Sequence, residues 1–252
     1  MKKEASPKKK KSQKGQSSDI KDIFRRIRHR DFSGYTGLAV KNSIYQILTT
    51  LFSRVGSLMF TILLARILLP DIFGLYSLAL STIVIFSVIA ELGTSQALII
   101  FVSKNLARNK PSKAKAYLDY FSKIKISLIL LSVTALLISS KFIADNFYNK
   151  PIFLALLGGG IYILFRSGWG FLESIFYSVN RFKELFFKEI LFQILRLIIV
   201  PLTSFLLLKS LVFSESTIAF SVILLLSFVH LVVFSFLLIN SHRSIDLSLI
   251  HI

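Results

Sequence analysis

Residues 42–69 read NSIYQILTTLFSRVGSLMFTILLARILL, and Arg54 and Arg66 are the only charged side chains in this stretch. About 20 apolar residues are enough to cross ~30 Å of hydrocarbon as an α-helix. A helix satisfies its own backbone hydrogen bonds in lipid and a lone strand does not, so the stretch predicts a transmembrane helix. A guanidinium near the middle of such a helix costs about 2.5–3.5 kcal/mol on insertion scales, which makes Arg54 a candidate functional residue.

Further apolar stretches follow this one along the chain. The six spans are predicted at residues 40–68, 73–102, 118–144, 151–179, 185–208 and 216–240. The composition of the 252-residue chain agrees, because 54% of its residues are hydrophobic and only 17% are charged. The alternation expected of β-barrel strands is not seen. The sequence therefore predicts an all-α polytopic membrane bundle, with a transmembrane lobe of six helices over residues 39–241.

The segments that flank this lobe differ from it in composition. Residues 1–18 are rich in lysine and low in complexity, which predicts a disordered tail. Residues 19–38 place apolar residues at helical spacing among arginines. This pattern predicts a basic amphipathic segment on anionic membrane lipids, with a solvated linker helix as the alternative. Residues 242–252 are predicted to form a short cytoplasmic tail.

Proline and glycine mark expected boundaries and irregularities. Pro70 separates the first span from the second, and Pro151 is expected in the first turn of the fourth helix. Pro201 lies inside the fifth span and is predicted to kink it. Residues 158–160 are three glycines, which either loosen the fourth helix or allow its neighbours to pack closely.

Basic residues are distributed unevenly about the predicted spans. If the N-terminus is cytoplasmic, 24 of the 31 lysines and arginines lie in residues 1–41, 103–125, 181–188 and the C-terminal tail. By the positive-inside rule, this bias predicts a multi-pass protein of the cell membrane with both termini in the cytoplasm. The bias also accounts for the net charge of +18 without a nucleic-acid partner.

Polar residues within the spans fall on common helix faces. Arg54, Arg166 and Arg196 are the embedded arginines, and guanidinium groups that face lipid are unfavourable. The spans are therefore expected to enclose a wet interior lined by these three substrate-binding candidates. Its further polar and charged members are expected to be Gln46, Thr50, Ser57, Glu91 and Glu173.

Two interpretations of the embedded arginines stay open. In the structural one, an arginine pairs with Glu91 or Glu173 and holds the bundle together. In the functional one, the arginines bind an anion, because the planar guanidinium stays charged and matches phosphate oxygens. Three embedded arginines against two embedded carboxylates leave one positive charge over, which favours an anionic ligand.

Signatures of catalysis and of metal binding are absent from the sequence. Its four histidines are scattered, it has no cysteine, and it contains no HExxH, GxSxG or Walker pattern. We therefore expect no catalytic residue, metal site or cofactor, and a transporter rather than an enzyme. Without an ATP site, transport would use an ion gradient, a substrate gradient or withdrawal of the product.

Two motifs resemble those of a known family. Residues 65–76, ARILLPDIFGLY, resemble the pattern ARxLGPxxFGxYxLA of polysaccharide (O-antigen type) flippases in the multidrug/oligosaccharidyl-lipid/polysaccharide exporter superfamily. Residues 90–98, AELGTSQAL, resemble their xDLGxxxAL stretch, with Glu91 where aspartate is common. Arg54 also resembles an arginine of lipid II flippases, but Phe60 stands where that branch has a second cation, which argues against lipid II as the cargo.

The resemblance implies movement of polyprenyl-diphosphate-linked oligosaccharide from the cytoplasmic to the outer leaflet during surface polysaccharide biosynthesis. It also implies alternating access between two six-helix lobes, of which this chain resembles the N-terminal one. The expected partners are the lipid-linked oligosaccharide and a second transmembrane lobe, from a separate chain, a missing half or another copy. By position, Arg54 is the candidate for contacting the diphosphate, whereas Arg166 and Arg196 are chosen by depth.

Two other functions are weighed against this one. A cation-coupled multidrug exporter of the same superfamily would rely on Glu91 or Glu173, and the surplus of arginine argues against it. A truncated membrane scaffold without transport activity is the remaining alternative.

Overall fold

The computed structural model describes residues 34–209 and 213–250, and the regular structure in these ranges is all helical. The prediction of an all-α protein is thereby confirmed. The chain divides into two compact units, residues 1–48 and 49–252. The predictions made for residues 1–18, and for residues 19–33 of the amphipathic segment, lie outside the described residues.

The helices follow one another with short connections. They are α2 (Gly34–Ile67), α3 (Pro70–Glu91), α4 (Thr94–Ala107), α5 (Pro111–Phe142), the π-helical turn η1 (Ile143–Tyr148), α6 (Phe153–Ser178), α7 (Phe182–Lys209) and α8 (Glu215–Ile250). Among the described residues, six helical segments are long and apolar enough to cross a membrane. These segments are Gly37–Ile67, Pro70–Ala107, Pro111–Tyr148, Phe153–Ser178, Phe182–Lys209 and Glu215–Ser241. The six predicted spans are confirmed, with ends that differ by a few residues.

The second membrane span is interrupted, which the sequence analysis did not predict. α3 ends at Glu91, and α4 begins at Thr94. Between them Leu92 and Gly93 have φ angles of 27° and 75°. Gly93 tolerates this left-handed conformation because it has no Cβ atom. The Thr94 hydroxyl donates to the Glu91 carbonyl oxygen at 2.9 Å. Glu91 therefore lies at a helix break and not in the middle of a helix.

Two further boundaries differ from the predictions. α6 begins at Phe153, so Pro151 lies in the connection before the helix and not in its first turn. Asn149, directly after η1, has a left-handed backbone conformation, and helical structure resumes at Phe153. α8 continues to Ile250, past the predicted start of a tail at residue 242. Pro201 lies inside α7, and the predicted kink stays a prediction.

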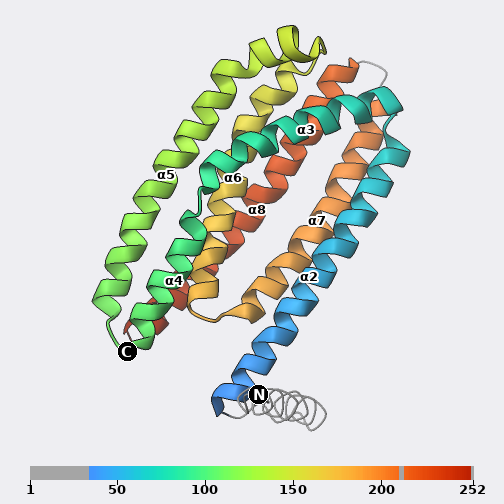
Figure 1. The fold of residues 1–252 in the computed structure, drawn as a ribbon. Coiled ribbons are helices and arrows are strands. Elements are labelled where there is room, and N and C mark those ends of the chain that lie inside the picture. The colour runs from blue at the N-terminus through green and yellow to red at the C-terminus, as the bar shows by residue number, and fades with distance from the viewer. Residues whose placement is uncertain (1–33, 210–212, 251–252) are drawn as a thin grey trace, which may run out of the picture. The chain divides into compact units, whose positions relative to one another are not determined.

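The core of the second unit forms where α6 packs along α8 and between α3 and α5 (Figure 1). The three glycines of α6 make this packing possible. A Cβ atom on Gly159 would overlap the side chain of Ile83 on α3 and lie 3.1 Å from Leu136 on α5. One on Gly158 would lie 3.0 Å from the ring of Phe220 on α8. The packing interpretation of the glycine run is therefore confirmed.

Candidate functional site

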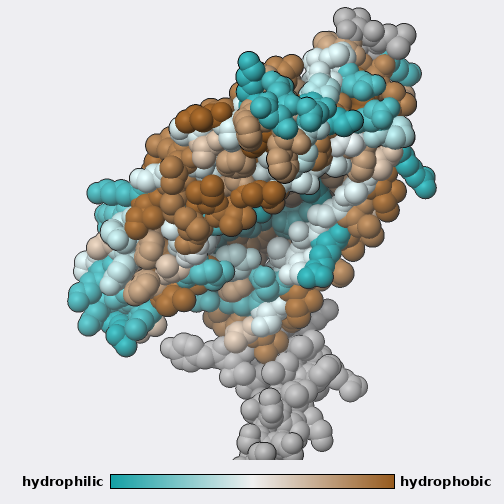
Figure 2. Space-filling model, turned by 45° about the horizontal axis from the view of Figure 1, so that its top comes forward, coloured by the Kyte–Doolittle hydropathy of each residue, from teal (hydrophilic) through white to brown (hydrophobic). Residues whose placement is uncertain are grey.

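A cavity of about 430 Å³ lies between α3, α4 and α6, beside the break that separates α3 from α4. Its polar lining consists of Ser87, Glu91, Ser95, Gln96, Tyr162, Arg166, Ser167, Glu173, Ser174 and Tyr177. Figure 2 shows hydrophilic surface recessed between hydrophobic side chains on one face of the molecule. Three of the residues singled out from the sequence, Glu91, Arg166 and Glu173, thus line one cavity.

A buried lysine holds the first cavity carboxylate. Lys125 of α5 places Nζ 2.9 Å from Oε1 of Glu91. The other carboxylate oxygen, Oε2, accepts a hydrogen bond from the Ser95 hydroxyl at 3.0 Å. Lys125 belongs to the predicted cytoplasmic segment of residues 103–125, yet its side chain is buried between the helices and not exposed as a loop lysine would be.

A second buried lysine holds the other cavity carboxylate. Lys188 of α7 forms ion pairs with Glu173 and, at 3.1 Å, with Glu189. Its ammonium group also lies 4.4 Å from the ring centroid of Trp169, within the range of a cation–π interaction. Lys188 belongs to the predicted cytoplasmic segment of residues 181–188, and Glu189 is not among the predicted embedded carboxylates. Both side chains are buried, and both residues lie in a helix that is long and apolar enough to cross a membrane.

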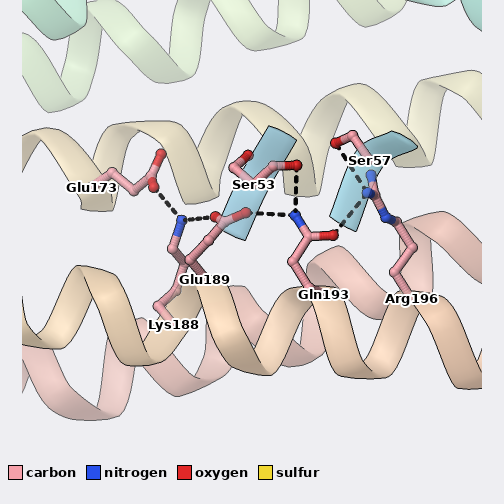
Figure 3. Close-up of polar contacts among 7 residues, drawn as sticks. All are labelled: Ser53, Ser57, Glu173, Lys188, Glu189, Gln193 and Arg196. Carbon is pink, nitrogen blue, oxygen red and sulfur yellow. Dashed lines mark hydrogen bonds and ion pairs between the residues drawn. The ribbon is translucent and has the colours of Figure 1, made fainter. Parts of the chain in front are cut away.

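A chain of hydrogen bonds continues from this ion pair to α2 (Figure 3). Gln193 donates from Nε2 to Glu189 Oε1 at 2.6 Å and accepts at Oε1 from Arg196 Nη2 at 2.8 Å. Arg196 Nη2 also donates to the Ser57 hydroxyl at 3.1 Å, and Gln193 Nε2 lies 3.5 Å from the Ser53 carbonyl oxygen. These contacts connect the middle of α7 to the backbone and side chains of α2.

Arg196 is surrounded by protein groups and lies outside the cavity lining. Its guanidinium carbon is 4.6 Å from the ring centroid of Phe60 and 4.9 Å from that of Phe192. Phe60 thus offers an aromatic face to Arg196. Together with the bonds to Gln193 and Ser57, these rings indicate that Arg196 holds α7 against α2.

The predicted α2 residues lie apart from the cavity lining. Arg54 is exposed, and it makes no hydrogen bond or ion pair with any residue in the described part of the chain. Thr50 is exposed as well, whereas Ser57 is half-buried and bonded to Arg196. Gln46 is half-buried and belongs to the first unit. Their predicted roles in binding stay predictions.

Of the three predicted arginines, Arg166 lines the cavity. Its side chain is exposed, and its guanidinium carbon lies 5.2 Å from the Trp169 ring centroid. Within the described ranges, none of the three predicted arginines forms an ion pair with Glu91 or Glu173. The structural interpretation that joined arginines to these carboxylates is therefore wrong, because buried lysines occupy that place.

The embedded charged residues in the structure are not the same set as the one predicted from the sequence. Around the cavity and the α7 chain the cations are Lys125, Arg166, Lys188 and Arg196, and the carboxylates are Glu91, Glu173 and Glu189. One positive charge is still in surplus. Arg166 is the cation of this set that is exposed and lacks a direct hydrogen-bonded or ion-paired acidic neighbour in the described residues.

The fold and the cavity define a multi-pass helical membrane protein with a charged polar pocket between its helices. In the ranges that the structure describes, no group of three His, Cys, Asp or Glu side chains could hold a metal ion. A family model described as polysaccharide biosynthesis protein matches residues 39–250, and the chain belongs to this family. The match confirms the resemblance noted in residues 65–76 and 90–98. Comparisons with curated proteins and with solved structures give no match.

Proposed function

We propose that this protein moves polyprenyl-diphosphate-linked oligosaccharide from the cytoplasmic to the outer leaflet, as a transporter and not as an enzyme. The observation that supports this function most directly is the position of Arg166. Its exposed guanidinium lines the polar cavity, and the residue lies in a helix that is long and apolar enough to cross a membrane. An uncompensated cation at membrane depth is unfavourable unless it meets water or an anion. Membership of a polysaccharide biosynthesis family supports a glycan-bearing ligand.

The phosphates of this ligand are proposed to meet Arg54 and Arg166. Both side chains are exposed within apolar helices, and neither is engaged by a carboxylate of the described residues. A guanidinium can bind a phosphate group through two parallel hydrogen bonds. Arg196, the third predicted arginine, is already bonded to Gln193 and Ser57, which favours an indirect role through the position of α2.

We also propose that a second transmembrane lobe covers the cavity and that both termini face the cytoplasm. A lobe that faces Arg54 and Arg166 would shield these exposed cations from lipid, which accommodates them poorly. The bias of basic residues toward one side persists after Lys125 and Lys188 are removed from the cytoplasmic count. Purification of the protein as a complex with another six-helix chain, or as a dimer, would support the second lobe.

Export of surface polysaccharide in cells that depend on this protein tests the function. Arg166→Ala and Arg54→Ala are expected to lower export at least tenfold at an unchanged amount of protein in the membrane. Arg108→Ala is the matched control, because Arg108 is exposed in the turn between α4 and α5 and outside the cavity. Normal export by both variants would contradict the proposed role of the arginines.

The alternative of a cation-coupled multidrug exporter would need a carboxylate that binds and releases a cation. Glu91 and Glu173 are each paired with a buried lysine, which argues against such exchange. Dye efflux that depends on Glu173 and is lost in Glu173→Gln would support the exporter instead. A deletion that leaves both export and efflux unchanged would support the scaffold.

A further inference from the structure

Gly170 lies between a cation and an anion of the cavity, and a methyl group at this position would contact both. A Cβ atom on Gly170 would lie 3.4 Å from Oε1 of Glu91 and 3.7 Å from Nη1 of Arg166. The two atoms therefore border the same space, yet they are too far apart to form an ion pair. A hydroxyl group is both a donor and an acceptor. A ligand hydroxyl that enters this space can donate to Glu91 and accept from Arg166.

The buried lysines determine which ligand groups the rest of the cavity can accept. Lys125 behind Glu91 and Lys188 behind Glu173 place a buried cation on the inner side of each carboxylate. The cavity side of each carboxylate is thus an acceptor of hydrogen bonds. Such oxygens bind the hydroxyl groups of a neutral ligand and repel the oxygens of a phosphate.

We propose that this cavity binds the sugar rings next to the diphosphate, with the diphosphate itself outside the Gly170 space. This inference rests on the proposed function, because it assigns one part of the same ligand to one part of the site. The hydroxyl-bearing Tyr162 and Tyr177 line the same wall of α6 as Arg166 and Glu173, at helical spacing. The volume of about 430 Å³ lies in the range of roughly 300–1,000 Å³ that is usual for small-molecule pockets.

Binding of neutral sugars to the purified protein in nanodiscs tests the assignment. The probes are a panel of uncharged methyl glycosides and, separately, inorganic pyrophosphate, titrated by calorimetry. Trp169 is the single tryptophan of the chain and lies beside Arg166, so its fluorescence reports whether binding occurs at this cavity. We expect at least one glycoside to bind and to change the emission of Trp169, and we expect pyrophosphate to bind with the same affinity to the wild type and to Gly170→Ala.

Gly170→Ala is the decisive variant, because its methyl group would fill the space without a steric clash. We expect it to weaken glycoside binding at least tenfold. Alanine favours a helix, so the fold should be retained. Gly74→Ala is the matched control: a Cβ atom there meets nothing within 4 Å, and its affinity for glycosides should equal that of the wild type.

The results separate the sugar site from the proposed function. Unchanged glycoside affinity in Gly170→Ala, an equal loss of glycoside and pyrophosphate affinity in that variant, or no glycoside binding to the folded protein would each overturn the sugar site. Glycoside binding that depends on Gly170, in a protein that does not move lipid-linked oligosaccharide, would leave the site standing and refute the proposed function. Export by a protein that binds no glycoside would refute the sugar site and leave the proposed function standing.

Discussion

Lys125 Nζ lies 2.9 Å from Glu91 Oε1, and the two side chains of this ion pair differ sharply in exposure, at 2% and 42%. The lysine is enclosed between helices, whereas the carboxylate faces the cavity at the break between α3 and α4. An ion pair with one buried end positions its exposed end. The position of this cavity carboxylate is therefore determined by its contact with α5.

This asymmetry predicts unequal effects of removing the two partners. Glu91→Gln leaves the ammonium group of Lys125 buried without a counter-ion, which is expected to cost about 3–5 kcal/mol of unfolding free energy. Lys125→Met leaves Glu91 partly hydrated and still bonded to Ser95, so a loss of about 1–2 kcal/mol is expected. Denaturant unfolding in detergent measures both values. Equal losses, or a larger loss in Lys125→Met, would show that the burial of the lysine does not govern the pair.

The close contact between Gly56 of α2 and Gln193 of α7 gives a second prediction. A Cβ atom on Gly56 would overlap the Gln193 side chain, whose amide is engaged by Glu189 and Arg196. Gly56→Ala should displace this amide and cost about 1–3 kcal/mol. The double variant Gly56→Ala/Gln193→Ala should recover part of the loss in a double-mutant cycle of thermal unfolding. Strictly additive effects would contradict the contact.

The glycine run of α6 contains its own matched pair. Gly159→Ala would force a methyl group into Ile83, and we expect a loss of about 1–3 kcal/mol. Gly160→Ala meets Val133 and Leu137 at 3.4 and 3.5 Å, which is ordinary contact, and alanine gains about 0.5–1 kcal/mol of helix propensity. Gly160→Ala is thus expected to be neutral or slightly stabilising in thermal unfolding. The reverse order would mean that α6 does not pack as described.

Arg196 and Arg54 should differ in their contribution to stability. Arg196→Ala removes the hydrogen bonds to Gln193 and Ser57 and two aromatic contacts, so a loss of about 2–4 kcal/mol is expected. Arg54→Ala removes an exposed side chain, for which a change within about 0.5 kcal/mol is expected. Melting temperatures of the two purified variants provide the comparison. A strongly destabilised Arg54→Ala would mean that any loss of export in this variant reflects folding.

The candidate site was predictable only in part from the sequence. Arg166, Glu91 and Glu173 were found because a charged residue inside an apolar run is conspicuous. Lys125 and Lys188 were missed because each lies near the end of a predicted span, where a lysine usually reaches the headgroups. The adjacent opposite charges of Lys188 and Glu189 at the start of an apolar run are the sequence signal that indicates such a pairing.

The six membrane spans, the helical fold and the family motifs were determined by the sequence alone. These features depend on local composition, because a long apolar stretch in lipid must form a helix whatever its neighbours are. The partners of the embedded charges were decided by tertiary structure. The ion pair of Lys188 with Glu173 depends on how α6 and α7 face each other, and that of Lys125 with Glu91 depends on how α3 and α5 face each other. Electrostatic attraction acts through space between helices far apart in the chain, and no periodicity within one helix records it.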